Sequence, residues 1–413
     1  MNIKKDKENL VSQYNYFSYP PVPIEDIKLD YIDKGKRPMG DPDFSWHLLW
    51  PEKKFQRKKI EILIAGCGTD QAAIQAMLNP HCNIVGVDIS ELSIEHEKKL
   101  KDKHKLNNLR LICDDFRNLQ FDYKFDLIIA SGVIHHLLDP LSALKYFHNT
   151  LKDDGVIHLM VYGSKQSYAL NEVKKIFNLL DYKQDKNSIK NASELIKNLN
   201  NLHPAKCFNQ SRDLLYDSGI VDLLLHNHET FFDIDDLLAL FKKSNLIIKN
   251  FFNGELDSLT KYFLHDFDSI NKIRKMNAEE RLKHSQIFNW NDRMMNFVIT
   301  KDKNIKQSLF YNNFDLKKFY TFQNRYIDYE INENNITVNE KFSGLKYHYQ
   351  YKKDFNLNWK EILIGKKLLE EQFNNSNKDF HKNILNLFQV LIENHHLDVS
   401  FEPINNSKLN INI

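Results

Sequence analysis

The sequence predicts an α/β fold, with a parallel sheet between layers of helices, a helical insertion and a small α+β domain at the C-terminal side. Two observations predict the main fold. From about residue 59, short β-branched runs alternate with stretches of helical periodicity. These runs are almost entirely apolar, as expected of strands that are covered on both faces.

Five strands and three helices are expected in this alternation. The strands cover residues 60–65, 83–87, 109–112, 125–131 and 156–162. The helices cover residues 71–78, 91–104 and 141–151, where apolar side chains recur at helical spacing. Helices at these places would cover the two faces of the sheet.

A different pattern follows residue 162. The interval of about 163–245 is rich in helical stretches and is expected to form a cap over the active site. Strand-like runs return at 246–252 and 295–300. Runs at 326–331, 336–338 and 345–351 then alternate like a small antiparallel sheet, with Asn334-Asn335 as a turn, and helices are expected at 359–373 and 379–394.

This organisation predicts three parts. Residues 1–45 form an N-terminal aromatic and proline-rich arm, residues 46–305 form the α/β domain, and residues 306–413 form the small α+β domain. The chain has 413 residues, of which 42% are hydrophobic, and is long enough for two such domains.

Charge and hydropathy exclude several classes of partner. The 57 Lys and Arg residues nearly balance the 55 Asp and Glu residues. The net charge of +2 therefore does not indicate the excess of positive charge that is typical of a nucleic-acid-binding protein. The N-terminal residues carry no apolar signal segment, and no run of about 18 apolar residues occurs. A cytoplasmic protein without a membrane or nucleic-acid partner is expected.

The cysteines do not indicate a metal cluster or a disulfide framework. They are scattered without C-x-x-C spacing, at Cys67, Cys82, Cys113 and Cys207.

A glycine turn follows the first expected strand, in the stretch "ILIAGCGTDQ". Gly66 and Gly68 lack a Cβ atom, so their backbone N–H groups can approach a ligand closely. The dinucleotide fingerprint G-x-G-x-x-G would need glycine at position 71, which is Gln71 here. The lysine of a phosphate-binding loop is also absent. A nicotinamide or flavin dinucleotide and a nucleoside triphosphate are therefore disfavoured.

Five segments in order resemble the successive motifs of class I S-adenosylmethionine (SAM)-dependent methyltransferases. They are "ILIAGCGTDQ", "IVGVDISELSIEHEKK", "LRLICDDFRNLQF", "FDLIIASGVIHHLLDP" and "LKDDGVIHLMVYG", and they span roughly residues 59–162. The resemblance implies a Rossmann-like sheet of seven strands, closed by an antiparallel pair formed from the two late strands. It also implies SAM as the cofactor.

The resemblance gives each turn at the sheet edge a role. Asp88 ends the second strand, where a carboxylate can accept both ribose hydroxyls, although it could instead cap the helix that starts at Ser90. An acid after the third strand, Asp115 or its neighbour Asp114, would take the adenine amino group. The cofactor-binding residues implied are Gly66, Cys67, Gly68, Asp88, Ile89, Asp115, Phe116, Ser131 and Gly132.

Two positions depart from the family pattern. Many members carry an acid two residues before the first loop glycine, where this chain has Ile64, and the third glycine of the loop is Asp70 here. The usual partner of the methionine ammonium is thus missing. Asp70, a residue of the N-terminal arm or the backbone would replace it.

Two histidines follow the fourth strand. Methyl transfer is an in-line displacement, for which positioning matters most and a base is optional. We expect His135 to be the catalytic candidate, as a base or as an orienting group, with a purely structural role as the alternative.

The stretch "VDLLLHNHETFFDIDDLLALF" resembles a bacterial methyltransferase subgroup that is sometimes joined to tetratricopeptide repeats. The subgroup pattern D-L-x-x-H-x-x-E-x-x-F maps onto Asp222, His226, Glu229 and Phe232, while Thr230 stands where a histidine is often seen. His226, His228 and Glu229 lack a distant fourth ligand and make a poor zinc site, so no metal is expected.

The arm carries "SQYNYFSYPPVPIEDI", which could fold over the cofactor, bind a partner domain or simply pack on the surface. The substrate-binding residues expected are Tyr19, His136, Tyr162, His226 and Glu229. The sequence thus predicts a SAM-dependent methyltransferase with a small-molecule acceptor. A protein methyltransferase and a non-catalytic SAM-binding protein are the alternatives.

Overall fold

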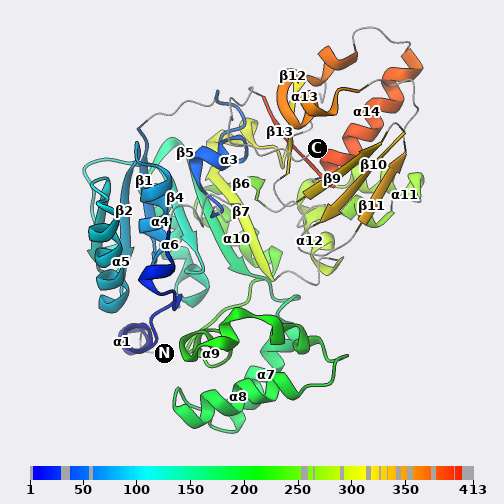
Figure 1. The fold of residues 1–413 in the computed structure, drawn as a ribbon. Coiled ribbons are helices and arrows are strands. Elements are labelled where there is room, and N and C mark those ends of the chain that lie inside the picture. Colours follow the sequence, from blue (N-terminus) through cyan, green and yellow to red (C-terminus); the bar gives the residue numbers. More distant parts are fainter. Residues whose placement is uncertain are drawn as a thin grey trace. The chain divides into compact units, whose positions relative to one another are not determined.

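The computed structural model describes thirteen stretches of the chain (Figure 1). They are residues 3–28, 38–54, 59–252, 259–263, 266–288, 293–312, 318–324, 327–332, 334–340, 346–350, 357–373, 378–394 and 396–401. The chain divides into two compact units. The first comprises residues 1–44, 58–246 and 293–295, and the second comprises residues 45–57, 247–292 and 296–413. The domain boundaries predicted at residues 45 and 305 stay predictions.

The central sheet has seven strands in the order β3-β2-β1-β4-β5-β7-β6, which is the order of the Rossmann-like methyltransferase fold. The strands are β1 (Glu61–Ala65), β2 (Asn83–Asp88), β3 (Leu109–Cys113), β4 (Phe125–Ser131), β5 (Leu151–Tyr162), β6 (Leu246–Phe251) and β7 (Met294–Lys301). Strands β1 to β5 pair in parallel, and β1 lies between β2 and β4. The predicted fold class is confirmed.

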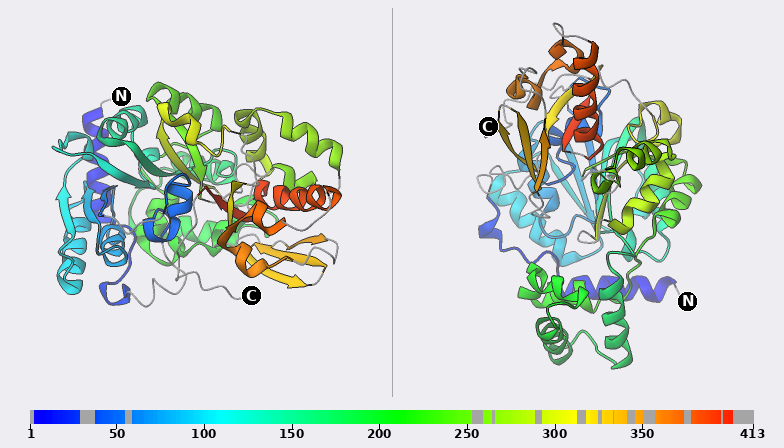
Figure 2. Two further views of the ribbon diagram at one scale, coloured as in Figure 1. Left: turned by 90° about the horizontal axis from the view of Figure 1, so that it is seen from above. Right: turned by 90° about the vertical axis from the view of Figure 1, so that its right-hand side faces the viewer.

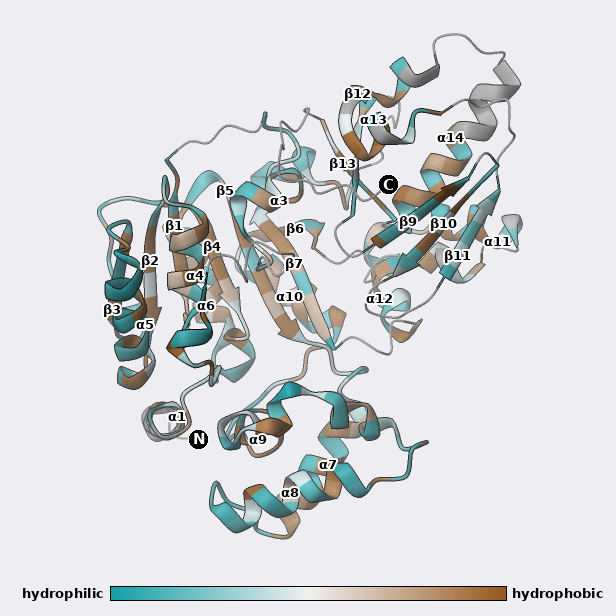
Figure 3. Ribbon diagram, in the orientation of Figure 1, coloured by the Kyte–Doolittle hydropathy of each residue, from teal (hydrophilic) through white to brown (hydrophobic). Residues whose placement is uncertain are grey.

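Three helices follow the strands as predicted, namely α4 (Gln71–Leu78), α5 (Glu91–His104) and α6 (Pro140–Thr150). Helix α5 begins where the Ser90 hydroxyl accepts a hydrogen bond from the Ser93 N–H, and α6 begins with Asp139 as its cap and Pro140 in its first turn. Figure 3 shows hydrophobic residues concentrated in β1 and β4, whereas α5 is largely hydrophilic. The sheet interior is therefore the core of this region.

The predicted helical insertion follows β5. It contains α7 (Tyr168–Leu179), α8 (Lys186–Asn198), η4 (Pro204–Gln210), η5 (Arg212–Leu215) and α9 (Asp217–Leu224), and α10 (Ile234–Lys243) leads back to β6. These helices bury a core of their own, which includes Leu170, Phe177, Ile196 and Val221. Helix α1 (Ile3–Tyr16) lies beside this insertion in Figure 1 and in the right-hand view of Figure 2. The arm continues through η1 (Ile24–Asp26) to α3 (Pro42–Leu49).

The second unit contains two small sheets, in the orders β11-β10-β9 and β12-β8-β13. The strands are β8 (Tyr320–Gln323), β9 (Ile327–Asn332), β10 (Asn335–Glu340), β11 (Lys346–Gln350), β12 (Ile364–Leu368) and β13 (Leu397–Ser400). The helices are η7 (Leu259–Phe263), α11 (Phe267–Lys275), α12 (Ala278–Phe288), η8 (Asp302–Gln307), α13 (Trp359–Leu363), η11 (Leu369–Phe373) and α14 (Lys378–Glu393). Strands β9, β10 and β11 are the predicted antiparallel sheet, while Tyr326, Leu345 and Tyr351 lie outside the described residues.

The helix predicted at 359–373 is wrong. Helix α13 ends at Leu363, and the chain then forms β12, which pairs with β8. Gly365 has φ +65°, a left-handed conformation that glycine adopts without penalty and that a continuous helix does not contain. The apolar spacing on both sides of Gly365 therefore belongs to separate elements.

Among the residues that the structure describes, no helix is both long enough and apolar enough to cross a membrane.

Candidate active site

The glycine turn joins β1 to α4 at the carboxyl edge of the sheet. Gly66 and Gly68 have φ values of +73° and +58°, which few other residues adopt. The N–H groups of Gly66 and Cys67 both donate to the Val87 carbonyl, at 2.8 and 3.0 Å. The turn is thereby fixed to the end of β2.

Carboxyl groups surround the N-terminus of α4. The buried Glu97 accepts hydrogen bonds from the N–H groups of Ala72 and Ala73, at 2.8 and 2.9 Å. Burial raises the pKa of Glu97 well above its usual value, and burial raises the pKa of Asp70 to about 6. The helix amides that hold a pyrophosphate in a dinucleotide site are therefore taken by a carboxyl group here.

Asp88 fixes the turn from the other side. Its Oδ2 accepts from the Gly68 N–H and its Oδ1 from the Ser90 N–H, both at 2.9 Å. Burial raises its pKa, and these backbone hydrogen bonds oppose that rise. The cap of α5 is the Ser90 hydroxyl, so Asp88 is not needed for that role. Ile89, which follows it, is half-buried.

Asp115 lies at the end of β3 and pairs with Arg117. Its carboxylate accepts from the Arg117 Nε at 3.0 Å and from a terminal guanidinium nitrogen at 2.8 Å. Asp114 accepts from the Asn118 amide at 2.9 Å and is more exposed. Phe116 is buried and stacks on Phe147 with ring centroids 5.2 Å apart.

Strand β4 ends at Ser131, and Gly132 follows with φ +77°. A Cβ atom on Gly132 would have a single neighbour within 4 Å, the Met160 methyl at 3.6 Å. The space beside this residue is therefore open.

The N-terminal arm crosses the glycine turn. A Cβ atom on Gly68 would lie 2.8 Å from the Tyr19 carbonyl oxygen, and the Thr69 hydroxyl donates to the Pro20 carbonyl. The Tyr19 hydroxyl donates to Asp213 in the insertion at 2.8 Å. The arm thus packs against the turn; that it folds over the cofactor stays a prediction.

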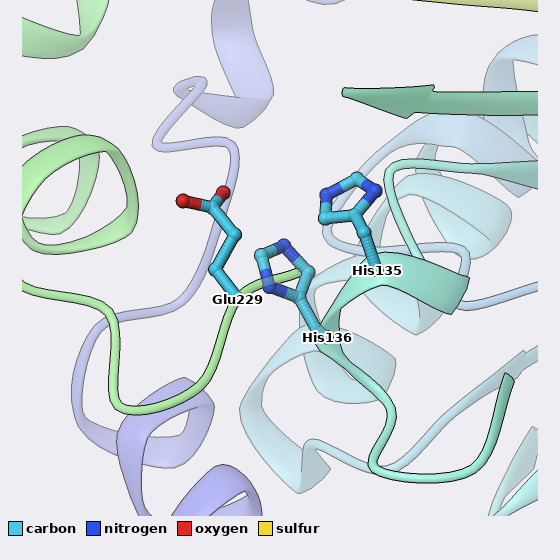
Figure 4. A group of neighbouring side chains, drawn as sticks. All are labelled: His135, His136 and Glu229. Carbon is cyan, nitrogen blue, oxygen red and sulfur yellow. The ribbon is translucent and has the colours of Figure 1, made fainter. Parts of the chain in front are cut away.

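His135, His136 and Glu229 gather beyond the end of β4 (Figure 4). The two histidines lie on η3 (Ile134–His136), and Glu229 lies on the loop after α9. His135 is fully buried, and neither of its ring nitrogens has a hydrogen-bond partner among the described residues. Burial lowers the pKa of His135 well below its usual value, so its ring is neutral at pH 7. Glu229 pairs with Lys174 of α7 through Oε2.

Tyr14 of α1 joins a neighbouring group. Its hydroxyl donates to Asp222 at 3.0 Å and lies 3.1 Å from the His226 Nε2. The His226 ring stacks on His136 with centroids 3.9 Å apart. A helix at the start of the chain therefore completes a site formed by the insertion.

Tyr162 ends β5 and faces the same region. Its ring centroid lies 4.3 Å from that of His135, and the Arg293 guanidinium lies 3.8 Å from the Tyr162 ring centre. Burial raises the pKa of Tyr162, which keeps its hydroxyl protonated. His135, His136 and Tyr162 are thus close together, although the histidines were expected after the fourth strand and Tyr162 at the end of the fifth.

The sequence profile of a family described as "Methyltransferase domain" matches residues 56–281, more than half of the chain. The chain belongs to this family. The match covers the glycine turn, the histidines of η3 and the insertion.

Curated relatives match over shorter segments. An uncharacterized protein of Synechococcus is 26% identical over 181 residues, which is 40% of each chain. A malonyl-[acyl-carrier protein] O-methyltransferase of Bacillus anthracis is 26% identical over 27% of this chain and 41% of its own. A ribosomal protein L11 methyltransferase of Thermosipho africanus is 32% identical over 26% of this chain and 39% of its own. The chain spans about two fifths of the length of these relatives.

A solved structure extends the likeness in fold. PKMT2 from Rickettsia typhi in complex with AdoHcy has a TM-score of 0.63 and 15% identity, over 87% of this chain and 75% of that chain. At this identity the likeness concerns the fold alone. It supports the methyltransferase fold over most of the chain's length.

Sequence reasoning missed several residues of the site. Glu97, Asp213 and Arg293 were not predicted as site residues. Glu97 stands in the second quoted motif, but its contacts, like those of Asp213 and Arg293, are with residues of other elements and form only on folding. Tyr14 stood in the aromatic segment that was singled out, but its partners in the insertion were not foreseen. The cofactor and substrate roles of the predicted residues stay predictions.

Proposed function

We propose that this protein transfers a methyl group from SAM to an acceptor, and that the acceptor is a small molecule. The observation that carries the proposal is the ring of carboxyl groups at the glycine turn. Glu97 takes the first amides of α4, and Asp70 and Asp88 lie beside the same turn. Such a turn repels a pyrophosphate and suits a ligand that carries positive charge and hydroxyl groups.

The residues present fit SAM in this position. Asp88 would bind the ribose hydroxyls with the lone pairs that its two backbone hydrogen bonds leave free. Asp70 would pair with the methionine ammonium in place of the acid that is missing at Ile64. The segment after β3, with Asp114, Asp115 and Phe116, would border the adenine. SAM supplies an electrophilic methyl group on its sulfonium.

The acceptor side is formed by η3, the end of β5 and the insertion. His135 is neutral and fully buried, so it can accept a proton from an acceptor without first losing one. The hydrogen bonds of Tyr14 and Tyr19 hold the arm against the insertion, and this cover would keep water from the acceptor. This enclosure supports a small acceptor. The remaining predicted substrate residues, His136, Tyr162, His226 and Glu229, border the same space.

A polypeptide is the second candidate acceptor, because one relative in the family is named for a ribosomal protein substrate. The predicted module 306–413 would then recognise that polypeptide. Membership of the subgroup that is sometimes joined to tetratricopeptide repeats is part of this proposal and rests on the pattern formed by Asp222, His226, Glu229 and Phe232.

Calorimetry with SAM, S-adenosylhomocysteine and NAD tests cofactor binding. We expect both sulfur ligands to bind and NAD not to. Asp88→Ala weakens SAM binding by roughly 1–3 kcal/mol, since ligand hydroxyls lose a charged acceptor. Asp185→Ala is the matched control, because it removes the cap of α8 and lowers the stability of the protein but leaves SAM affinity unchanged. Tight NAD binding without SAM binding would refute the proposal.

A transfer assay identifies the acceptor. The purified protein is incubated with methyl-labelled SAM and a fractionated cell extract. Label in the low-molecular-weight fraction supports a small acceptor, and label in protein supports the second candidate. Label in neither, with SAM bound, identifies a binding protein without transferase activity.

A further inference from the structure

We propose that His135, His136 and Glu229 form a binding site for a divalent transition-metal ion of the zinc class, beside the acceptor space. Each of the three offers one ligand atom, and these atoms lie within 4.8 Å of one another (Figure 4). This site was not predicted, because the two histidines and Glu229 lie far apart along the chain and come together only on folding.

Unpaired polar atoms in this group support the site. Both ring nitrogens of His135 and the Oε1 atom of Glu229 are buried and have no hydrogen-bond partner among the described residues. The His135 side chain is wholly inaccessible to solvent. Buried polar atoms are rarely left unpaired in folded proteins, and a bound ion or water is the usual reason when they are. His135 and Glu229 thus both carry buried, unpaired polar atoms within this one group.

The surroundings orient His136 for binding. Its Nδ1 lies 3.2 Å from the His228 carbonyl oxygen, so Nδ1 carries the proton and Nε2 keeps its lone pair. A backbone carbonyl on the second ring nitrogen is a common way to fix a metal-binding histidine. The stacked His226 ring holds the His136 ring from one side.

A second group, His136, Asp222 and His226, is the weaker candidate. The His226 Nε2 lies 3.1 Å from the Tyr14 hydroxyl, and its Nδ1 accepts from the His228 N–H at 3.1 Å. Asp222 also accepts from Tyr14. These atoms already have partners, so we assign this group a supporting role.

The donor set indicates the kind of ion. Two imidazoles and one carboxylate bind Zn²⁺ in catalytic sites and leave a position open for another ligand. Mg²⁺ and Ca²⁺ prefer oxygen ligands and bind such a set poorly. The ion would take the one lone pair of the neutral His135 ring, so His135 would then hold the ion instead of accepting a proton. An acceptor oxygen in the open position would lose its proton more readily. That last consequence rests on the proposed function, whereas ion binding does not.

Metal titration of the full-length, chelator-treated protein tests the site without an activity assay. We expect Zn²⁺ to bind by calorimetry, Co²⁺ to give visible d–d absorption, and Mg²⁺ to give neither heat nor competition. His135→Gln and Glu229→Gln each weaken Zn²⁺ binding at least tenfold. The matched control is His228→Gln, whose side chain belongs to neither group and which leaves the affinity unchanged.

The Zn²⁺ affinity of the Lys174→Met variant distinguishes metal binding by Glu229 from a purely structural role of Glu229. Lys174 pairs with Glu229, so removing its charge lowers the repulsion on the ion and tightens Zn²⁺ binding. The proposal is overturned if the wild type binds no Zn²⁺ or Co²⁺, or if both ligand variants bind like the wild type. Circular dichroism checks whether each ligand variant is folded. One folded variant, His135→Gln or Glu229→Gln, is enough for the test. If the protein binds SAM but no metal ion, only the metal-site inference is refuted. If it binds the metal ion but not SAM, only the proposed cofactor is refuted.

Discussion

Asp70 is a half-buried carboxyl at the start of α4 that does not cap the helix. Burial raises its pKa to about 6, above its usual value of 3.8. A raised carboxyl pKa means that its contribution to stability is complete at low pH and is lost as the pH rises through about 6. At neutral pH the ionised Asp70 therefore destabilises the free protein, which suggests that it is retained for binding.

We predict that Asp70→Asn stabilises the protein without SAM at pH 7.5, by up to about 3 kcal/mol, and gives no gain at pH 4. Urea unfolding at the two pH values measures this. Asp102→Asn, on the exposed face of α5, is the control and changes neither value. If Asp70 pairs with the cofactor ammonium, the same variant weakens SAM binding. Equal stability of wild type and Asp70→Asn at pH 7.5 would contradict the burial argument.

At the scale of elements, the position of the arm against the glycine turn depends on the close approach of Tyr19 to Gly68. Gly68 and Gly132 both have left-handed backbones, so alanine strains either position by roughly 1 kcal/mol. Only at Gly68 would the new methyl group also collide with backbone, at 2.8 Å from the Tyr19 carbonyl.

We therefore predict that Gly68→Ala displaces the arm and that Gly132→Ala does not. Hydrogen exchange of residues 10–20 rises in the first variant and stays unchanged in the second. SAM affinity falls with the first variant as well, because Gly68 also donates to Asp88. Equal exchange in the two variants would mean that the arm tolerates the methyl group.

The main sheet was predictable because most of its strands contain a short apolar run, and β4 was predicted at its observed bounds. Strand β5 begins at Leu151, earlier than the predicted residue 156, because Lys152, Asp153 and Asp154 interrupt its apolar pattern. The short strands β8 and β13 were missed. Each has four residues, and their pairing joins Tyr320 to Ser400, which no local pattern records. The helix predicted at 359–373 was wrong at Gly365, because apolar spacing alone does not show where a helix ends.

The site was predictable where it follows a strand. Gly66, Gly68, Asp88 and His135 stand in contiguous motifs, so the sequence located them, although it did not establish their roles. The partners of these residues come from other elements. Tyr14 reaches Asp222 across 208 residues, and such contacts exist only after folding.

At the scale of the whole molecule, the second unit is assembled from three separate segments. His47 contacts Asp398 at 3.0 Å, and the Arg274 guanidinium pairs with Glu393 through three hydrogen bonds. The Lys249 ammonium is fully buried and pairs with Glu52. Residues 306–413 are therefore packed within this unit against earlier parts of the chain.

We predict that removing residues 306–413 exposes the rest of the second unit. Arg274 and His47 lose their partners, so limited proteolysis cuts within residues 259–288 faster than in the full chain. Glu393→Gln is a milder control, which weakens one pair and leaves the cleavage pattern unchanged. We expect SAM affinity within a few-fold of that of the full chain, because the glycine turn belongs to the first unit. An unchanged cleavage rate would support an independent C-terminal module.

The contact between Pro51 and the residues at the end of β13 has a consequence for biosynthesis. Pro51 accepts hydrogen bonds from Ser400 and Phe401, so this segment leaves the ribosome long before its partners are made. At ordinary translation rates the delay is about 20 to 70 s. During that time Trp46 and Trp50 are without their final neighbours and are exposed to chaperones or to misfolding. Stalled nascent chains of increasing length should therefore become protease-resistant at residues 45–54 only after β13 has emerged.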